Sequence, residues 1–504
     1  MANVITTMTP EEIVGGLRSS YRELENEGRL IRAGLKEEQH TAEIVERYAW
    51  LYSDAALAVA TEAEQDAPAG DRESARRVRS AIMQGIINRR IAAMDDSLGT
   101  HYSSAKVSLA GGEEMSFFTA QSMLFRERDA RRREQLGEGV SKVMTEVDDM
   151  ALDVMRTTMD VIKSFGYDSY VAFWSDLKQV DYSRLQAEVE RVAAACRESY
   201  QMWITPRMEA AGSRYGECSR WHFSYFRGLP EHDAAFSKAA FEPAMRRTFA
   251  AMGLDLFSVP SIHIDLEDRP AKNPRASVWV PEAGVEVHLL TRPLGGGLDY
   301  EAFMHEAGHA LHYGLTDPAI GWPLANLGRS MAYAELWSYL MERIGFEPAW
   351  LHEALGVNED EAERIAADMV GVDLMMFMRY CGKLAYELEL FAGDPLDPVR
   401  GRGLYANLLT ERTGFRYSPQ PWQWDRDPGL YSADYLRAWL AQSALRQRLI
   451  EMFGARWWAS KGAGRWLRNQ WRRGSIPEAE ETVAEAGAKP WSGDALISAM
   501  HRRR

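Results

Sequence analysis

Cysteine is one of the scarcest residues of this chain, with three among 504 residues. Cys196, Cys218 and Cys381 lie far apart and are odd in number. They therefore make neither a disulfide framework nor a cysteine zinc cluster. This usage is typical of a reducing compartment, and we expect a cytoplasmic protein.

Long apolar runs, a leader and an excess of basic charge are also missing. A membrane-spanning helix needs about 18 consecutive apolar residues, and no such run occurs. The beginning of the sequence has no basic segment followed by an apolar one, so no signal peptide is indicated. The formal net charge is −14, so no large basic surface is available to neutralise phosphates. We predict no membrane or nucleic-acid partner, and the oligomeric state stays open.

Histidine is also rare, with 11 residues, yet two of them occur in the run from His305 to His309, which reads His-Glu-Ala-Gly-His. Side chains at positions i and i+4 share one face of a helix, so both imidazoles can bind a single ion. Glu306 lies beside the first histidine, where it can act as general base on a water molecule. The run matches the H-E-x-x-H pattern of zinc hydrolases. We predict one zinc ion per chain, with His305 and His309 as ligands.

The flanking residues indicate that this motif lies on a helix. Asp299 follows three glycines and is predicted as the N-cap of a helix over residues 300–313. Apolar residues recur along this segment at helical spacing. The alternative is that both histidines are hydrogen-bonded core residues. Burying two histidines and a glutamate without a metal or a partner is costly, which favours the metal site.

A catalytic zinc needs a third protein ligand and an open fourth position. After a segment rich in glycine and proline, a second helix is predicted over residues 330–343. Glu335 and Glu342 are two turns apart on one face of it. We predict Glu335 as the third ligand, and Glu342 as the acceptor for the free N–H of a ligand histidine. The alternative for both glutamates is a solvated helix face.

These residues resemble the thimet oligopeptidase and oligoendopeptidase F family of zinc peptidases. The resemblance rests on the zinc motif, on Glu335 thirty residues after His305, and on Glu342. Two outer segments extend it: residues 265–277, which begin Asp-Leu-Glu-Asp-Arg-Pro-Ala-Lys, and residues 429–436, which read Gly-Leu-Tyr-Ser-Ala-Asp-Tyr-Leu. It covers the chain from about residue 166 to the C-terminus.

The resemblance implies a mainly α-helical, multi-helix zincin-type fold, with a small β-sheet beside the zinc helix and a deep substrate cleft. It implies hydrolysis of peptide bonds in short oligopeptides. Tyr431 and Tyr435 match the family's tyrosine pair, so they are the expected donors to the developing oxyanion. The alternative for these tyrosines is packing within an apolar helix stripe. His312 also matches a family position, where it is expected beside the ligands or in packing.

One departure from the family pattern concerns a histidine that precedes the first tyrosine and helps to stabilise the reacting carbonyl. This chain has Asp425, Arg426 and Asp427 there, and no histidine occurs between His352 and His501. Arg426, another donor or the tyrosines alone would have to take that role, or the activity is weakened or redirected. The carboxypeptidase family typified by the Taq enzyme resembles the chain in length and in the glutamate spacing.

The remaining pattern is helical at both ends, with strands only between about residues 259 and 291. Helices are predicted from Thr9-Pro10 onward and over residues 41–64, 73–94 and 182–210. We divide the chain into an N-terminal helical region, residues 1–200, that walls the cleft, and a catalytic region, residues 201–504. Val285–Leu290 alternates and is predicted as an edge strand that can pair with an extended peptide; the alternative is an ordinary hairpin.

The chemistry that the sequence favours is zinc-dependent hydrolysis of peptide bonds. Glu306 removes a proton from the attacking water and passes it to the leaving amine. Two other functions stay open: a relative that binds peptides or a partner protein without cutting them, and a zinc hydrolase that acts on a non-peptide amide. An intact Glu306 argues against pure binding, because a binding protein needs no general base.

Overall fold

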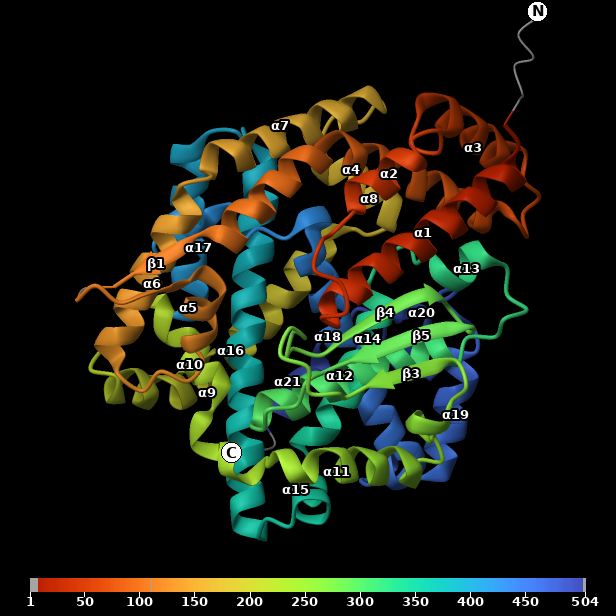
Figure 1. The fold of residues 1–504 in the computed structure, drawn as a ribbon. Helices are drawn as coiled ribbons and strands as arrows, with labels where there is room; N and C mark the ends of the chain where they lie inside the picture. The colour runs from red at the N-terminus through yellow and green to blue at the C-terminus, as the bar shows by residue number, and fades with distance from the viewer. Residues whose placement is uncertain (1–7, 110, 502–504) are drawn as a thin grey trace, which may run out of the picture.

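The computed structural model describes residues 8–109 and 111–501. Within these residues it contains 21 α-helices and five short strands, so the predicted mainly α-helical fold is confirmed (Figure 1). None of the helices in the described ranges is both long and apolar enough to cross a membrane.

The first part of the chain is helical except for one small hairpin. Its elements are α1 (Pro10–Arg32), α2 (Thr41–Arg47), α3 (Asp54–Asp66), α4 (Arg72–Ser104), β1 (Lys106–Ser108), β2 (Glu114–Ser116), α5 (Phe117–Met123), α6 (Ala130–Thr145), α7 (Asp148–Ser164), α8 (Tyr170–Lys178), α9 (Tyr182–Ala210), α10 (Phe223–Gly228) and α11 (Lys238–Ala251).

The second part begins with three strands and is helical from there on. Its elements are β3 (Ile262–Asp265), β4 (Ser277–Glu282), β5 (Glu286–Leu290), α12 (Gly297–Gly314), α13 (Trp322–Asn326), α14 (Ala332–Glu342), α15 (Pro348–Leu355), α16 (Glu359–Ala392), α17 (Pro398–Thr413), α18 (Tyr431–Phe453), α19 (Lys461–Trp471), α20 (Ala479–Glu485) and α21 (Asp494–His501).

Strands β3, β4 and β5 form the small sheet beside the predicted zinc helix. The strand order is β3-β5-β4, with β5 parallel to β3 and antiparallel to β4. The prediction that Val285–Leu290 forms the edge is therefore wrong, because β5 has a neighbour on each side. A tight turn pairs β5 with β4 as a hairpin, and β3 fills its other side. The outer strand on the hairpin side is β4.

Helix α1 packs along β4 (Figure 1). Its start is the predicted one, with Pro10 in the first turn and a capping box between Thr9 and Glu12. Arg18 forms an ion pair with Glu282 of β4. Further along the helix, Glu25 accepts a hydrogen bond of 2.7 Å from the backbone N–H of Val280. The first helix thus occupies part of the outer edge of the sheet.

The other predicted helices agree with the structure to different degrees. The helix over residues 182–210 is found with those bounds as α9, although Pro206 lies inside it. The helix predicted over residues 41–64 is wrong, because α2 ends at Arg47 and α3 begins at Asp54. Leu51 and Tyr52, in the break between them, are buried against the core. Helix α9 continues through residue 200, and the division into two regions there stays a prediction.

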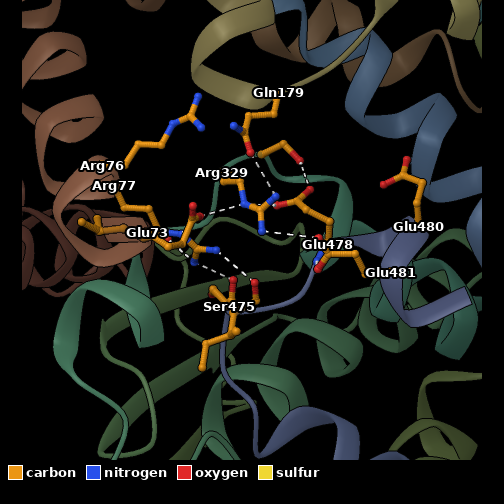
Figure 2. A network of polar contacts seen from close by, with 12 residues as sticks. Glu73, Arg76, Arg77, Gln179, Arg329, Ser475, Glu478, Glu480 and Glu481 are labelled. Carbon is orange, nitrogen blue, oxygen red and sulfur yellow. Dashed lines mark hydrogen bonds and ion pairs between the residues drawn. The ribbon is translucent and has the colours of Figure 1, made fainter. Parts of the chain in front are cut away.

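A polar network joins the N-terminal helices to the C-terminal segment (Figure 2). Arg77 of α4 donates to the carbonyl oxygens of Leu327 and Ser475, at 2.8 and 2.6 Å. Arg329 forms ion pairs with Glu73 of α4 and with Glu481 of α20. Three segments far apart in the sequence therefore meet just before α14, the helix that carries Glu335.

Candidate active site

Helices α12 and α14 cross at very short range, and a glycine of the zinc motif makes this crossing possible. A Cβ atom on Gly308 would lie 2.5 Å from the Ser338 Cα atom and 2.5 Å from the Trp337 carbonyl oxygen. Both are backbone atoms, which cannot swing aside as a flexible side chain would. The glycine thus brings the histidines of α12 within reach of the glutamates of α14.

The structure places the three predicted metal ligands together. The ligand atoms of His305, His309 and Glu335 all lie within 4.8 Å of one another. His305 Nε2 is 3.2 Å from Glu335 Oε2, and His309 Nε2 is 3.7 Å from Glu335 Oε1. The side chains are only 18%, 12% and 4% exposed, respectively. Two imidazole nitrogens and one carboxylate are a donor set typical of catalytic zinc.

Neighbouring residues orient these ligands. Glu342 Oε2 lies 2.9 Å from His305 Nδ1, so the Nδ1–H can donate to it and leave Nε2 free for a metal. The Tyr431 hydroxyl donates to Glu335 Oε1 at 2.7 Å. His309 Nδ1 and Glu335 Oε2 are buried without a hydrogen-bond partner. Buried polar atoms normally have partners, so the unpartnered Glu335 Oε2 atom, which faces His305 Nε2, is consistent with a cation between the three side chains.

The electrostatics of the site follow from burial and from the close carboxylates. Burial lowers the pKa of His309 to about 4, which keeps its imidazole neutral, as metal binding requires. Burial acts in the same direction on His305, but hydrogen bonds to Glu335 and Glu342 outweigh it and raise its pKa well above the usual value. The carboxylates therefore favour positive charge here, which a metal ion would supply.

Glu306 points toward the sheet side of the site. Burial raises the pKa of its carboxyl to about 7. His305, Arg275 and a hydrogen bond from the backbone N–H of Val278 act in the opposite direction and lower this pKa. A carboxyl with a raised pKa at the outer strand β4 is suited to exchange a proton near neutral pH.

His312 lies about one turn after His309 on α12 and is not one of the three predicted ligands. It is buried, and its Nε2 atom is 3.0 Å from the carbonyl oxygen of Gly474. Burial lowers the pKa of His312 to about 4, so it is neutral and ties α12 to the segment before α20.

The tyrosines predicted as donors come from the first two turns of α18. The two rings are 4.7 Å apart between centroids. Leu430, just before the helix, has the positive backbone angle φ 54°, and Lys178 of α8 holds the preceding turn by donating to the Gly429 carbonyl oxygen at 2.6 Å. Among the described residues, Tyr431 donates to Glu335, whereas the Tyr435 hydroxyl has no hydrogen-bond partner.

The segment that replaces the family histidine is held by cations of α16. Asp425 pairs with Arg379, and Asp427 Oδ2 is 2.8 Å from Lys383 Nζ. Arg426 points elsewhere, with its guanidinium 5.9 Å from the Phe391 ring centroid. The geometry therefore does not support Arg426 as a replacement for the histidine. Lys383 is paired with both aspartates of this turn, so it is not free to take the histidine's role.

Sequence reasoning missed three groups that border the site. Tyr339 of α14 packs edge-on against His305, with ring centroids 5.3 Å apart, and stacks on Trp439 of α18. Arg275 and the Val278 amide approach Glu306 from the sheet. The spacing of Tyr339, four residues after Glu335, was a signal that could have indicated its face. No local sequence pattern indicates Arg275 or the Val278 amide, because only the folding of the sheet against α12 brings them to the site.

Solved structures similar to this fold are peptidases. A crystal structure from Bacillus anthracis, described as that of an oligoendopeptidase F, has a TM-score of 0.61 at 13% identity, over 95% of this chain and 94% of that one. The M32 carboxypeptidase from Deinococcus radiodurans R1 has a TM-score of 0.57 at 15% identity, over 96% of this chain and 97% of that one. A carboxypeptidase from Pyrococcus furiosus has a TM-score of 0.60 at 13% identity, over 97% of this chain and 98% of that one.

These similarities establish the fold, and the fold implied by the resemblance is thereby confirmed along nearly the whole chain. No family model matches the sequence, and no curated protein matches it. Identities of 13% to 15% do not carry an activity from one protein to another, so function has to be argued from the site.

Proposed function

We propose that this protein is a zinc-dependent peptidase that hydrolyses peptide bonds in short oligopeptides. The observation that carries the proposal is the convergence of His305, His309 and Glu335, with ligand atoms within 4.8 Å of one another, next to Glu306. Zinc bound by these side chains supplies a Lewis acid that acidifies water and polarises a carbonyl group.

Glu306 is the general base in this proposal. Its carboxylate takes a proton from the attacking water and passes it to the leaving amine, a role worth roughly 10²–10⁴-fold in rate. The raised pKa of about 7 suits both steps. His305 and Glu335 are not available as the base in this proposal, because both side chains hold the metal ion.

The two tyrosines divide the remaining work. Tyr431 holds Glu335 through its hydroxyl at 2.7 Å, so it positions the third ligand. The hydroxyl of Tyr435 has no partner within the described chain and is the better candidate for donating to the developing oxyanion. This proposal departs from the expectation that both tyrosines donate to the oxyanion, because Tyr431 is given the role of holding Glu335.

The outer strand β4 offers a backbone on which an extended peptide can lie. The N–H of Val280 is bonded to Glu25 rather than to β5, so it points outward, and alternation along a strand places the N–H of Val278 on the same side. Adding a peptide strand beside this edge would bring its backbone close to Glu306.

The proposal is tested by metal analysis together with digestion of a mixed peptide library. We expect about one zinc per chain in the wild type, and loss of that zinc in the His305→Ala and His309→Ala variants. Oligopeptides should be cleaved, while stably folded proteins stay intact at the same enzyme concentration. Near-zero zinc in the wild type, with no gain when zinc is added, would rule out the site.

The structural neighbours include both an oligoendopeptidase and carboxypeptidases, so they do not favour cleavage within a peptide over cleavage near its end. If the wild type binds zinc and cuts no peptide, the binding protein or the non-peptide hydrolase takes the place of this proposal.

A further inference from the structure

The segment that leads into β4 is rich in basic residues, and all but one of the cations in its turn are neutralised locally. Arg269 forms ion pairs with Asp265 and Glu267. Lys272 is fully buried at its side chain and pairs with Asp265 at 2.8 Å. The exception is Arg275, which is exposed and forms no ion pair with any described residue. It lies two residues before the outer strand begins.

A second unpaired cation, Arg32, lies beside this segment at the end of α1. The backbone N–H of Asn273 donates to the Arg32 carbonyl oxygen at 3.0 Å, and Arg269 Nε donates to the Ala33 carbonyl oxygen at 2.9 Å. The Arg32 Nε atom is buried and has no hydrogen-bond partner. Within the described ranges, Arg32 also has no carboxylate in an ion pair.

The two guanidinium groups lie within electrostatic reach of each other and of the proposed base. Burial lowers the pKa of Arg32, the positive charge of Arg275 lowers it further, and Glu306 raises it. Arg275 in turn lowers the pKa of Tyr435, against a larger effect of burial. Glu306 is an anion near both guanidinium groups, but one carboxylate does not balance two positive charges, one of them partly buried, so a further anion is favourable there.

We propose that Arg275 and Arg32 form a subsite that binds a carboxylate of the peptide substrate, in the first place its C-terminal carboxylate. This inference rests on the proposed function, which it deepens by naming a substrate class. Guanidinium groups bind carboxylates through charge-assisted, often paired hydrogen bonds. An acidic side chain near the cleavage point offers the same chemistry and is the second source of the group.

The direction of β4 assigns the C-terminal end to this subsite. A peptide that pairs antiparallel to β4 brings its C-terminal side to Ser277, next to Arg275. A parallel peptide would bring its N-terminal side there, and a free amine would be repelled by two guanidinium groups. Glu25 occupies the Val280 amide and Glu306 occupies the Val278 amide, so the part of the edge left to a peptide is the end nearest Arg275. The arrangement therefore favours peptides with few residues beyond the cleavage point.

Peptide binding measured by calorimetry tests this subsite without relying on turnover. The protein is the zinc-treated Glu306→Gln variant, alone and combined with Arg275→Gln or Arg32→Gln. The matched control combines it with Arg29→Gln, because Arg29 lies on the same helix but its guanidinium donates to Asn26 at 3.1 and 3.2 Å. The probes are one N-acetylated tripeptide as free acid and as C-terminal amide, and amidated tripeptides that end in Glu or Gln.

The free acid should bind about 10- to 100-fold more tightly than the amide, as expected for a charge-assisted contact. The Arg275→Gln and Arg32→Gln changes should remove this preference, and Arg29→Gln should keep it. If the amidated peptide ending in Glu binds more tightly than the one ending in Gln, and both arginine changes remove this difference, the subsite binds a side-chain carboxylate. Equal binding of all probes, or a preference that survives both arginine changes, would overturn the inference. Because the readout is binding, a protein that binds acids selectively but cuts nothing would contradict the proposed function alone.

Discussion

The two halves of the proposed site are built in different ways. The ligand half consists of α12 and α14, whose backbones touch at Gly308, so its geometry comes from two neighbouring helices in close contact. The tyrosine half is the turn at residues 425–430 and the start of α18. It is held by buried charges from distant segments, among them Lys178, which is 2.7 Å from Asp434, and Lys383, which is 2.8 Å from Asp427.

The difference has an energetic consequence. Close packing of apolar and small residues loses stability gradually when one side chain is changed. A buried ion pair behaves otherwise, since removing one partner leaves an unpaired charge in a low-dielectric interior. We therefore expect the ligand half to keep its shape after moderate changes and the tyrosine half to depend on single residues far from it in sequence.

The largest effect is expected from Lys178→Met. This change removes the nearest cation from the buried carboxylate of Asp434, which keeps Arg437 at 3.7 Å, and it removes the donor to the Gly429 carbonyl oxygen. Loss of one partner of a buried ion pair costs about 3–5 kcal/mol in the free energy of unfolding. Chemical denaturation measures it. Adding Asp434→Asn to Lys178→Met should recover part of the loss, because the buried carboxylate that has lost its nearest cation is then neutral. A single variant as stable as the wild type would mean that the tyrosine half does not depend on this pair.

The next largest effect concerns Tyr435→Phe. Loss of one oxyanion donor costs about 10²–10³-fold in kcat, with little change in KM or zinc content.

Tyr431→Phe should instead weaken zinc binding, because it frees Glu335 Oε1. Arg426→Ala should leave kcat unchanged, since its guanidinium lies by Phe391. If the Arg426 variant loses kcat and both Phe variants keep it, the roles given to these residues are reversed.

A smaller effect is expected from Glu342→Gln. The amide can still accept a hydrogen bond from His305 Nδ1 but carries no charge, so zinc affinity should fall about 10- to 100-fold. Competition with a fluorescent chelator measures this. Glu353→Gln on α15, which loses only an exposed ion pair with Arg456, is the control and should bind zinc like the wild type. Equal affinity in all three proteins would show that Glu342 does not tune the site.

The ligand half could be predicted from sequence because its information is local. The H-E-x-x-H spacing and the two glutamates seven residues apart determine which side chains share a helix face. The structure brings His305, His309, Glu335 and Glu342 together as that spacing implies. One local detail differs from the prediction. The N-cap of α12 is Gly296 and not Asp299. Its carboxylate instead accepts from the backbone N–H groups of Leu294 and Gly295.

The rest depended on contacts that no local pattern encodes. The break between α2 and α3 exists because Tyr52 fits against Gly85 of α4, where a Cβ atom would lie 2.1 Å from its ring. The order of the three strands depends on β3 pairing with β5 and not with β4, the next strand in sequence. The partners of Asp427 and Asp434 come from α16 and α8, which lie far from them in sequence. Tertiary packing overrides local preference at each of these points.

The most direct test of the central claim is the behaviour of Glu306→Gln. We expect this variant to bind as much zinc as the wild type and to unfold at the same temperature or higher, because the three ligands are unchanged and a buried carboxyl has been neutralised. It should hydrolyse no oligopeptide that the wild type cleaves, since the general base is absent. Hydrolysis of such a peptide at the wild-type rate by zinc-loaded Glu306→Gln would contradict the account.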